Sequence, residues 1–145
     1  MKAYRFSLHT VLRIRGLEER LARERLVVAS RAVHQAEDTH RAREVVLAQL
    51  VAPPGVVTMN ELHWVADQAA RQAERILSSR QALIDAALAR DEARRAWYAA
   101  RQRASVLERL QAQGLARWKE EVQRKMGLEL DDLTNARHGY VGASQ

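Results

Sequence analysis

Apolar residues recur at spacings of three and four along the first fifty residues, which is the spacing of an amphipathic helix. The pattern predicts a helix from about residue 8 to residue 51, with Ser7 as the N-cap. Charged residues such as Glu24 and Arg31 interrupt the stripe, so we expect a thin and partly polar contact face. The residues expected on this face are Ile14, Leu17, Leu21, Val28, Ala32, Ala42, Val46 and Leu50.

The same spacing returns after the two prolines and predicts a second helix from about residue 58 to residue 134. Its small residues would allow a close approach of two backbones. Residues 137–145, which include two glycines, are expected to fray. The expected inner face of this helix consists of Leu62, Val65, Ala69, Ala73, Ile76, Leu83, Ala87 and Leu88, followed by Trp97, Ala104, Leu107, Leu110, Leu115, Trp118, Val122 and Met126.

A hinge over residues 52–57 separates the two helices. Pro53 and Pro54 have no backbone donor and must end the first helix, and Gly55 can take the positive φ that a chain reversal often needs. Thr58 and Glu61 have the S/T-x-x-E spacing of a capping box and predict the start of the second helix. Helix, reversal and helix indicate two antiparallel helices.

The helix lengths predict how far the two helices can pair. At 1.5 Å per residue the first is roughly 65 Å long and the second roughly 100 Å. Pairing outward from the hinge places Leu21 near Leu88 and Phe6 near Arg103, and leaves the second helix unpaired beyond Arg103. The predicted fold is therefore all-α: a single domain, residues 1–145, that forms a long antiparallel two-helix coiled-coil hairpin with a longer, overhanging second helix.

Composition supports this picture and narrows the function. The 145 residues include one Phe, three Tyr and three Trp, and 29% are charged, which suits a coiled coil better than a compact core. Cysteine is absent, which excludes disulfides and thiolate chemistry. No hydrophobic run has the length of a membrane span, so we expect a soluble cytoplasmic protein without a transmembrane segment. The net charge of +6 indicates an anionic partner.

Catalytic and cofactor motifs are absent from the sequence. The five histidines have no spacing that places two on one helical face. Asp131 and Asp132 are adjacent, so on a helix they point in different directions and make a poor acid–base pair. No phosphate-binding glycine loop or nucleophile elbow occurs. We therefore expect no enzyme activity, no catalytic residue, no cofactor and no metal site.

Basic residues gather in two stretches that the predicted hairpin brings together at its open end. Pairs such as Glu120 with Arg124 account for some of them as solvated helix charges. The remaining surplus on two adjoining helices indicates an anionic binding surface. These basic residues are Arg13, Arg15, Arg20, Arg23 and Arg25 in the first helix, and Arg90, Arg94, Arg95, Arg101, Arg103, Arg109, Arg117, Lys119 and Arg124 in the second.

The chain resembles the flagellar export protein FliJ family and its type III secretion relatives over nearly its whole length, the hinge included, and two segments carry the resemblance. The start, Tyr4-Arg5-Phe6-Ser7-Leu8 through Arg15, is similar to the family's aromatic-x-Leu opening with its following arginines and acids. Near the other end, Leu107-Glu108-Arg109-Leu110, Trp118-Lys119-Glu120-Glu121 and Glu129-Leu130-Asp131-Asp132 resemble its Leu-x-x-Leu, aromatic-x-x-Glu and closing acidic segments. Gly114 and Gly127 depart from the pattern, because family members usually have charged helix formers there.

The resemblance implies a non-enzymatic stalk at the cytoplasmic face of the inner membrane, in the flagellar export apparatus. Its open end would engage the export ATPase hexamer, and other surfaces would engage the export gate and export chaperones. The candidate gate contacts are Leu62, Trp64 and Val65. The candidate ring contacts are Arg13, Arg15, Arg20, Arg101, Arg103, Arg109, Leu107, Leu110 and Trp118.

Two other classes of function stay open at this point. The isoelectric point near 10.4 is compatible with a binder of nucleic acid or of an anionic surface. Scarce aromatics and interleaved acids disfavour that reading, so no nucleic-acid partner is favoured. The apolar overhang is compatible with a homodimeric coiled-coil scaffold.

Overall fold

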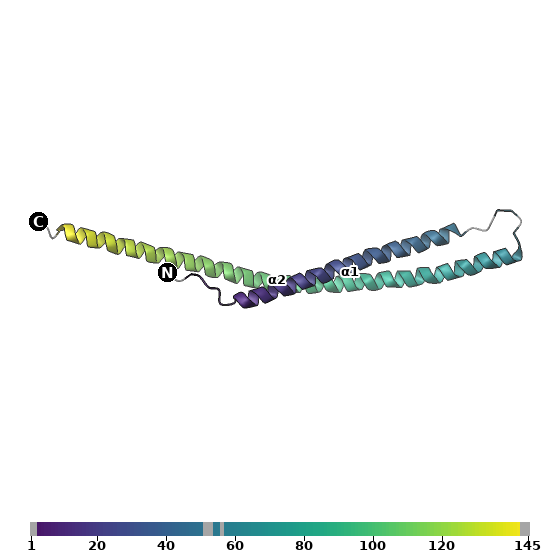
Figure 1. Cartoon of the computed structure of the whole chain (residues 1–145), viewed down its shortest axis with the longest axis horizontal. Helices are drawn as coiled ribbons and strands as arrows, with labels where there is room; N and C mark the ends of the chain where they lie inside the picture. The colour runs from purple at the N-terminus through teal and green to yellow at the C-terminus, as the bar shows by residue number, and fades with distance from the viewer. Residues whose placement is uncertain (1–2, 51–53, 56, 143–145) are drawn as a thin grey trace. The chain divides into compact units, whose positions relative to one another are not determined.

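The protein consists of two helices in the computed structural model (Figure 1), which describes residues 3–50, 54–55 and 57–142. Helix α1 spans His9–Gln49, 41 residues, and helix α2 spans Met59–Gly142, 84 residues. The predicted all-α hairpin with a longer second helix is confirmed. Both helices begin one residue later than predicted.

The end of α2 differs from the prediction. Residues 137–145 were expected to fray, and α2 instead continues to Gly142. The prediction gave too much weight to the glycines near the end, because a glycine inside a helix costs only about 1 kcal/mol and does not by itself end it.

The chain reversal is only partly visible, since Val51, Ala52, Pro53 and Val56 lie outside the described residues. Gly55 has a φ of 119°, the left-handed region that glycine adopts without strain. The predicted capping box forms. The Thr58 amide donates to Glu61 Oε2 at 2.8 Å, and the Glu61 amide donates back to Thr58 Oγ1 at 3.3 Å. The sequence therefore correctly locates the start of α2.

The chain divides into two compact units, each considered by itself below. Residues 18–100 form the first, called here the central unit. Residues 1–17 and 101–145 form the second, called here the terminal unit. Each unit contains part of both helices.

In the central unit, α1 and α2 lie side by side and antiparallel (Figure 1). Every residue of the contact face recurs at alternating spacings of three and four, the heptad pattern of a coiled coil. Small residues dominate alternate layers, so the backbones approach closely. The contact residues are all buried or half-buried. From α1 and the residue after it they are Glu19, Ala22, Leu26, Ala29, Val33, Ala36, His40, Arg43, Leu47 and Leu50, and from α2 they are Val65, Ala69, Gln72, Ile76, Ser79, Leu83, Ala86, Arg90, Ala93, Trp97 and Ala100.

The predicted contact face of the first helix is wrong except at its end, where Leu50 lies in the contact. Leu21 and Val28 are exposed, and Val33, which the prediction left out, is 4% exposed. The predicted stripe had larger side chains, but polar residues broke it. The observed face keeps its spacing from Glu19 to Leu50 without a break, because the polar residues within it find partners on α2.

The predicted face of α2 is partly right. Val65, Ala69, Ile76 and Leu83 lie in the contact, whereas Leu62, Ala73 and Leu88 are exposed. Ala73 and Leu88 do not fall on the alternating steps of three and four residues that the observed contact follows, and Leu62 lies before its first residue on α2, Val65.

The pairing register also differs from the prediction. Leu21 was expected near Leu88, but Glu19 meets Trp97 and His40 meets Ser79, a shift of roughly two turns. The prediction assumed a tight reversal that pairs the helix ends at once. The observed pairing places the end of α1 beside the third turn of α2, so α2 begins beyond it (Figure 1).

In the terminal unit, the segment before α1 packs on α2. The Tyr4 hydroxyl donates to the Gln111 carbonyl at 3.3 Å, and its ring lies 6.2 Å from that of Trp118. Gly114 lies between these two contacts, and a Cβ there would meet the Tyr4 hydroxyl. The expectation that α2 has no intramolecular partner after Arg103 is therefore wrong as far as Trp118.

Candidate partner-binding surfaces

The residues predicted to contact an ATPase ring lie in the terminal unit, except Arg20, which lies in the central unit. Arg13, Arg103 and Arg109 are exposed, as is Arg20. Arg15 is half-buried and makes polar interactions of its own. It is therefore the least available of the predicted arginines for an outside partner.

The three arginines of α2 do not form one patch. Residues two apart on a helix do not face each other, so Arg101 and Arg103 point to opposite sides. Arg101 Nη1 also lies 3.7 Å from Glu108 Oε1, which neutralises part of its charge locally. Arg103 has no such neighbour among the described residues.

Arg103, Leu107 and Leu110 share one side of α2, because their spacings are four and three. Leu110 is 44% exposed and Leu107 is half-buried. This side combines a cation with two branched apolar side chains over two helical turns. It is the part of the predicted ring surface that the structure brings together, and it is called here the Arg103 face.

Trp118, the last predicted ring contact, is half-buried against Tyr4. The sequence prediction placed it on a free overhang and missed Tyr4 as its partner. Tyr4 lies in the segment before α1, so no helical spacing relates it to Trp118 and the sequence carries no direct signal for this contact. With Tyr4 in place, only part of the Trp118 ring is open to a partner.

The predicted gate contacts lie near the start of α2. Trp64 is 58% exposed and Leu62 is 47% exposed, whereas Val65 belongs to the contact with α1. Residues two apart point in different directions on a helix, so Leu62 and Trp64 form no common patch. The structure does not join these three residues into one surface.

Two polar contacts between the helices were missed by the sequence prediction. Glu19, 8% exposed, accepts a hydrogen bond from Trp97 Nε1 at 2.8 Å and from Arg23 at 2.9 Å. His40 Nδ1 lies 2.9 Å from the Ser79 hydroxyl. Their heptad positions, seven residues from Leu26 and Val33 respectively, were the signal that could have found them.

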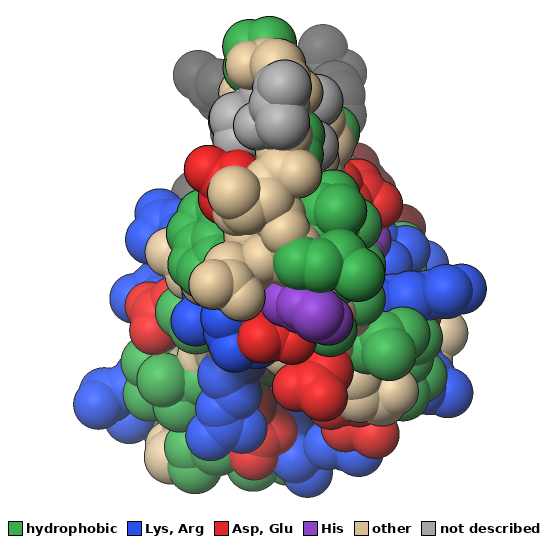
Figure 2. Space-filling model, turned by 90° about the vertical axis from the view of Figure 1, so that its right-hand side faces the viewer, with side chains coloured by type: hydrophobic (Ala, Val, Ile, Leu, Met, Phe, Trp, Pro, Cys, Tyr) green, Lys and Arg blue, Asp and Glu red, His purple; other side chains and the backbone are tan. Residues whose placement is uncertain are grey.

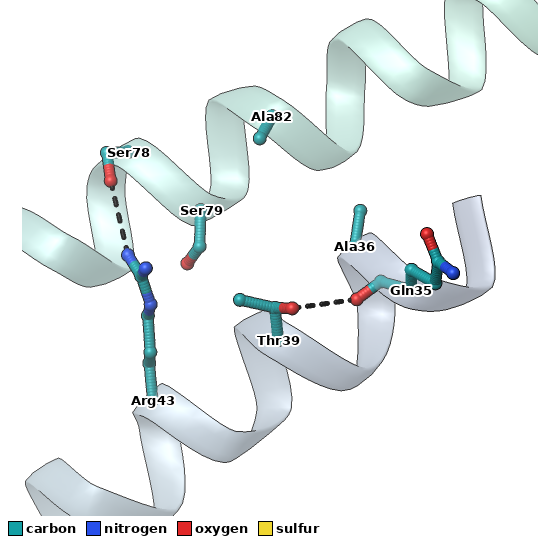
Figure 3. Close-up of a pocket in the computed structure, with 7 residues that line it drawn as sticks. All are labelled: Gln35, Ala36, Thr39, Arg43, Ser78, Ser79 and Ala82. Carbon is teal, nitrogen blue, oxygen red and sulfur yellow. Dashed lines mark hydrogen bonds between the residues drawn. The ribbon is translucent and has the colours of Figure 1, made fainter. Parts of the chain in front are cut away.

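A small groove with both polar and apolar lining lies between the helices at Arg43 (Figure 3). Arg43 Nη1 donates to the Arg75 carbonyl at 2.8 Å and lies 3.4 Å from the Ser78 hydroxyl, while Thr39 donates to the Gln35 carbonyl. The groove measures about 230 Å³, below the usual size of a small-molecule pocket. The guanidinium of Arg43 is already hydrogen-bonded to α2, and this contact stabilises the pairing of the two helices.

The surface carries mixed charge. At the end where the chain reverses, basic, acidic and hydrophobic side chains alternate over the visible face (Figure 2). Among the described residues, no cluster of three or more His, Cys, Asp or Glu side chains could hold a metal ion. Over the same residues, neither helix contains a stretch apolar enough to span a bilayer.

No family model matches the chain, and neither a curated protein nor a solved structure is similar to it.

Proposed function

We propose that this protein is a non-enzymatic stalk of a flagellar type III export apparatus, acting on the export ATPase ring. The observation that carries the proposal is the Arg103 face, a basic and apolar surface on the part of α2 just beyond the central unit. A helix presenting a cation beside leucines suits a ring interior that offers carboxylates and apolar loops. The resemblance of the two terminal segments to FliJ supports the same assignment.

The central unit suits the mechanical part of this role. A stalk has to hold two helices in a fixed register while a ring acts on one end. Contacts between Glu19 and Trp97 and between His40 and Ser79 fix the register of α1 against α2. The exposed Trp64 and Leu62 at the start of α2 are separate candidates for the export gate, and export chaperones would bind other exposed surfaces of the hairpin.

The proposed location is the cytoplasmic face of the inner membrane, reached through the other export components. A basic coiled coil that binds nucleic acid is the less favoured alternative, because acidic residues such as Glu108, Glu120 and Glu121 lie among the basic ones. Exposed aromatics for base stacking are also few.

Charge reversal on α2 tests the proposal against a matched control. Arg103→Glu reverses the cation of the Arg103 face, and Arg109→Glu reverses a second predicted ring contact that lies off this face. Together they should reduce stimulation of the purified export ATPase at least about tenfold, since two exposed cations become anions. Arg71→Glu with Arg75→Glu makes the same charge change at exposed positions of the central unit and should leave stimulation unchanged. Circular dichroism of both variants should match the wild type.

The nucleic-acid alternative predicts a different outcome. Both double variants would then weaken binding to fluorescent DNA about equally, with a steep dependence on salt. Wild-type protein that fails to stimulate the ATPase but binds DNA tightly would replace the stalk assignment with this alternative.

A further inference from the structure

The distal part of α2 carries a second stripe in heptad spacing, between residues 115 and 133. It consists of six positions separated alternately by four and three residues. Met126 and Leu133 are 51% and 67% exposed, and Leu115 and Val122 are half-buried. Among the described residues, no hydrogen bond, ion pair or ring contact involves any of the six. The stripe comprises Leu115, Lys119, Val122, Met126, Glu129 and Leu133.

This stripe borders the helix face that Tyr4 covers. Tyr4 contacts α2 at Gln111 and Trp118, whose spacing continues the α1 contact face. Leu115 lies three residues from Trp118 and Val122 lies four residues from it, so the start of the stripe adjoins that face and is half-buried. The residues from Met126 to Leu133 lie farther along α2 and are exposed, so a second helix would pack beside Tyr4 at the start of the stripe and on open surface at its end.

Two positions of the stripe carry opposite charges. Lys119 and Glu129 both occupy places where a coiled-coil core normally has an apolar residue. Each lies five residues from Arg124, one on either side. The apolar positions have the same symmetry, since Leu115 and Leu133 flank Arg124 equally, as do Val122 and Met126. From either end, the stripe therefore has apolar residues at the same positions, and Lys119 takes the place of Glu129.

We propose that this stripe forms an antiparallel coiled coil with the same stripe of a second copy of this chain. In an antiparallel pair, each core layer combines residues from opposite ends of the segment. The symmetry then places Leu115 against the partner's Leu133, and Val122 against the partner's Met126. Lys119 meets the partner's Glu129 in two equivalent layers.

Other alignments of the two copies are less favourable. In parallel pairing, the two copies of Lys119 lie opposite each other, and so do the two copies of Glu129. Two core layers then hold like charges. Moving the antiparallel pair by four residues in one direction sets Lys119 opposite Lys125. The proposed register alone matches every apolar position with an apolar one and every charge with its opposite.

One feature limits the strength of the pair. Lys125 lies beside the symmetry axis of the antiparallel pair, so the two copies of Lys125 come close to each other. Repulsion there opposes the two Lys119–Glu129 layers and weakens as salt rises. The proposal therefore predicts a reversible dimer that Lys125→Gln tightens by about threefold or more.

Sedimentation equilibrium of the full chain tests the proposal with charge reversals. Lys119→Glu or Glu129→Lys alone should weaken self-association by roughly tenfold or more, because each change places like charges in two layers. The double variant restores opposite charges and should dimerise like the wild type. A mixture of the two single variants should form a heterodimer, although neither dimerises well alone.

Matched controls lie on the opposite side of the same helix. Arg117→Glu and Asp131→Lys make the same charge changes two residues away and should leave self-association unchanged. A wild-type chain that stays monomeric throughout the concentration series would overturn the proposal and leave the stripe to a different protein. A double variant that fails to recover would overturn the register. The inference goes beyond the proposed stalk function and does not rest on it, because no ATPase enters the experiment.

Discussion

The central and terminal units use the same helix α2 in different ways. In the central unit, α2 buries a continuous face against α1, including Ser79 at 5% exposure and Ala100 at 6%. In the terminal unit, every side chain described after Val122 is exposed. Helix formation therefore rests on packing in the central unit and mainly on intrinsic propensity in the part of the terminal unit after Val122.

That difference separates the stable part of the molecule from the part that is available to partners. Apolar residues exposed in the terminal unit, such as Met126, Leu128 and Leu130, gain nothing from the fold of the single chain. Their burial energy is left for binding. Each prediction below tests whether a residue contributes to the packing of one unit or only to its surface.

The largest effect is expected at Trp97. Its indole N–H donates to the buried Glu19 carboxylate, and its ring is half-buried between the helices. Trp97→Ala removes the ring and leaves Glu19 with one partner fewer, so the free energy of unfolding should fall by about 3 kcal/mol. Trp64→Ala, at a position 58% exposed, should change it by less than about 0.5 kcal/mol in the same urea titration. Equal losses would contradict the assigned contact face.

A smaller effect is expected at Val33, which tests the face of α1 directly. Val33 is 4% exposed and Val28 is 64% exposed, although they stand five residues apart on one helix. Val33→Ala should lower the free energy of unfolding by about 2 kcal/mol, because it leaves a cavity in the contact. Val28→Ala is the control and should stay within about 0.5 kcal/mol of the wild type. The reverse ranking would restore the stripe expected from the sequence.

Two glycines of the terminal unit separate backbone effects from packing effects. A Cβ at Gly127 meets no atom within 4 Å, so Gly127→Ala should raise the free energy of unfolding by about 1 kcal/mol. A Cβ at Gly114 meets the Tyr4 hydroxyl, so Gly114→Ala displaces Tyr4 and should gain less. Cross-peaks between the Tyr4 and Trp118 rings in nuclear Overhauser spectra should disappear only in the Gly114 variant. Their persistence would show that Tyr4 does not approach α2 at that point.

The smallest effect concerns the start of α2. Hydrogen bonds from the Thr58 amide, and then from its hydroxyl, lower the pKa of Glu61 below its usual 4.5. Because the folded pKa is the lower one, the carboxylate stabilises the helix start fully above pH 4.5, and the effect fades as pH falls through the lowered value. Backbone amide shifts near Thr58 should therefore move at acidic pH, and in Glu61→Gln they should not follow this transition. Thr58→Ala should destabilise the exposed helix start by about 0.5 kcal/mol.

The sequence predicted the features that depend on local chemistry. Prolines, Gly55 and the Thr58–Glu61 spacing act within a few residues, so the reversal and the start of α2 follow from them directly. Helical spacing and the absence of breakers in turn predicted an all-α hairpin with a longer second helix. None of these features depends on which residues of α1 meet which residues of α2.

The features that depend on pairing could not be predicted in the same way. Glu19 and His40 looked like interruptions in α1, because their partners Trp97 and Ser79 lie far away in the sequence. When such polar residues are counted as part of the contact, the heptad spacing indicates a face and a register that differ from the predicted ones. Tyr4 was missed for the same reason, since its contact with Trp118 depends on how the segment before α1 runs.

Two of the polar contacts in the central unit also decide how the hairpin responds to force. Glu19 and His40 are about 30 Å apart along α1, and each binds a different point of α2. Sliding α1 by one heptad under shear would break both contacts at once. In one direction His40 would lie opposite Ala86, which offers it no hydrogen bond, whereas in the other direction Glu19 would lie opposite Arg90. Apolar and alanine layers alone would resist such sliding far less, because one heptad of them resembles the next. The central unit is therefore expected to resist sliding more strongly in the direction that sets His40 against Ala86 than in the direction that sets Glu19 against Arg90.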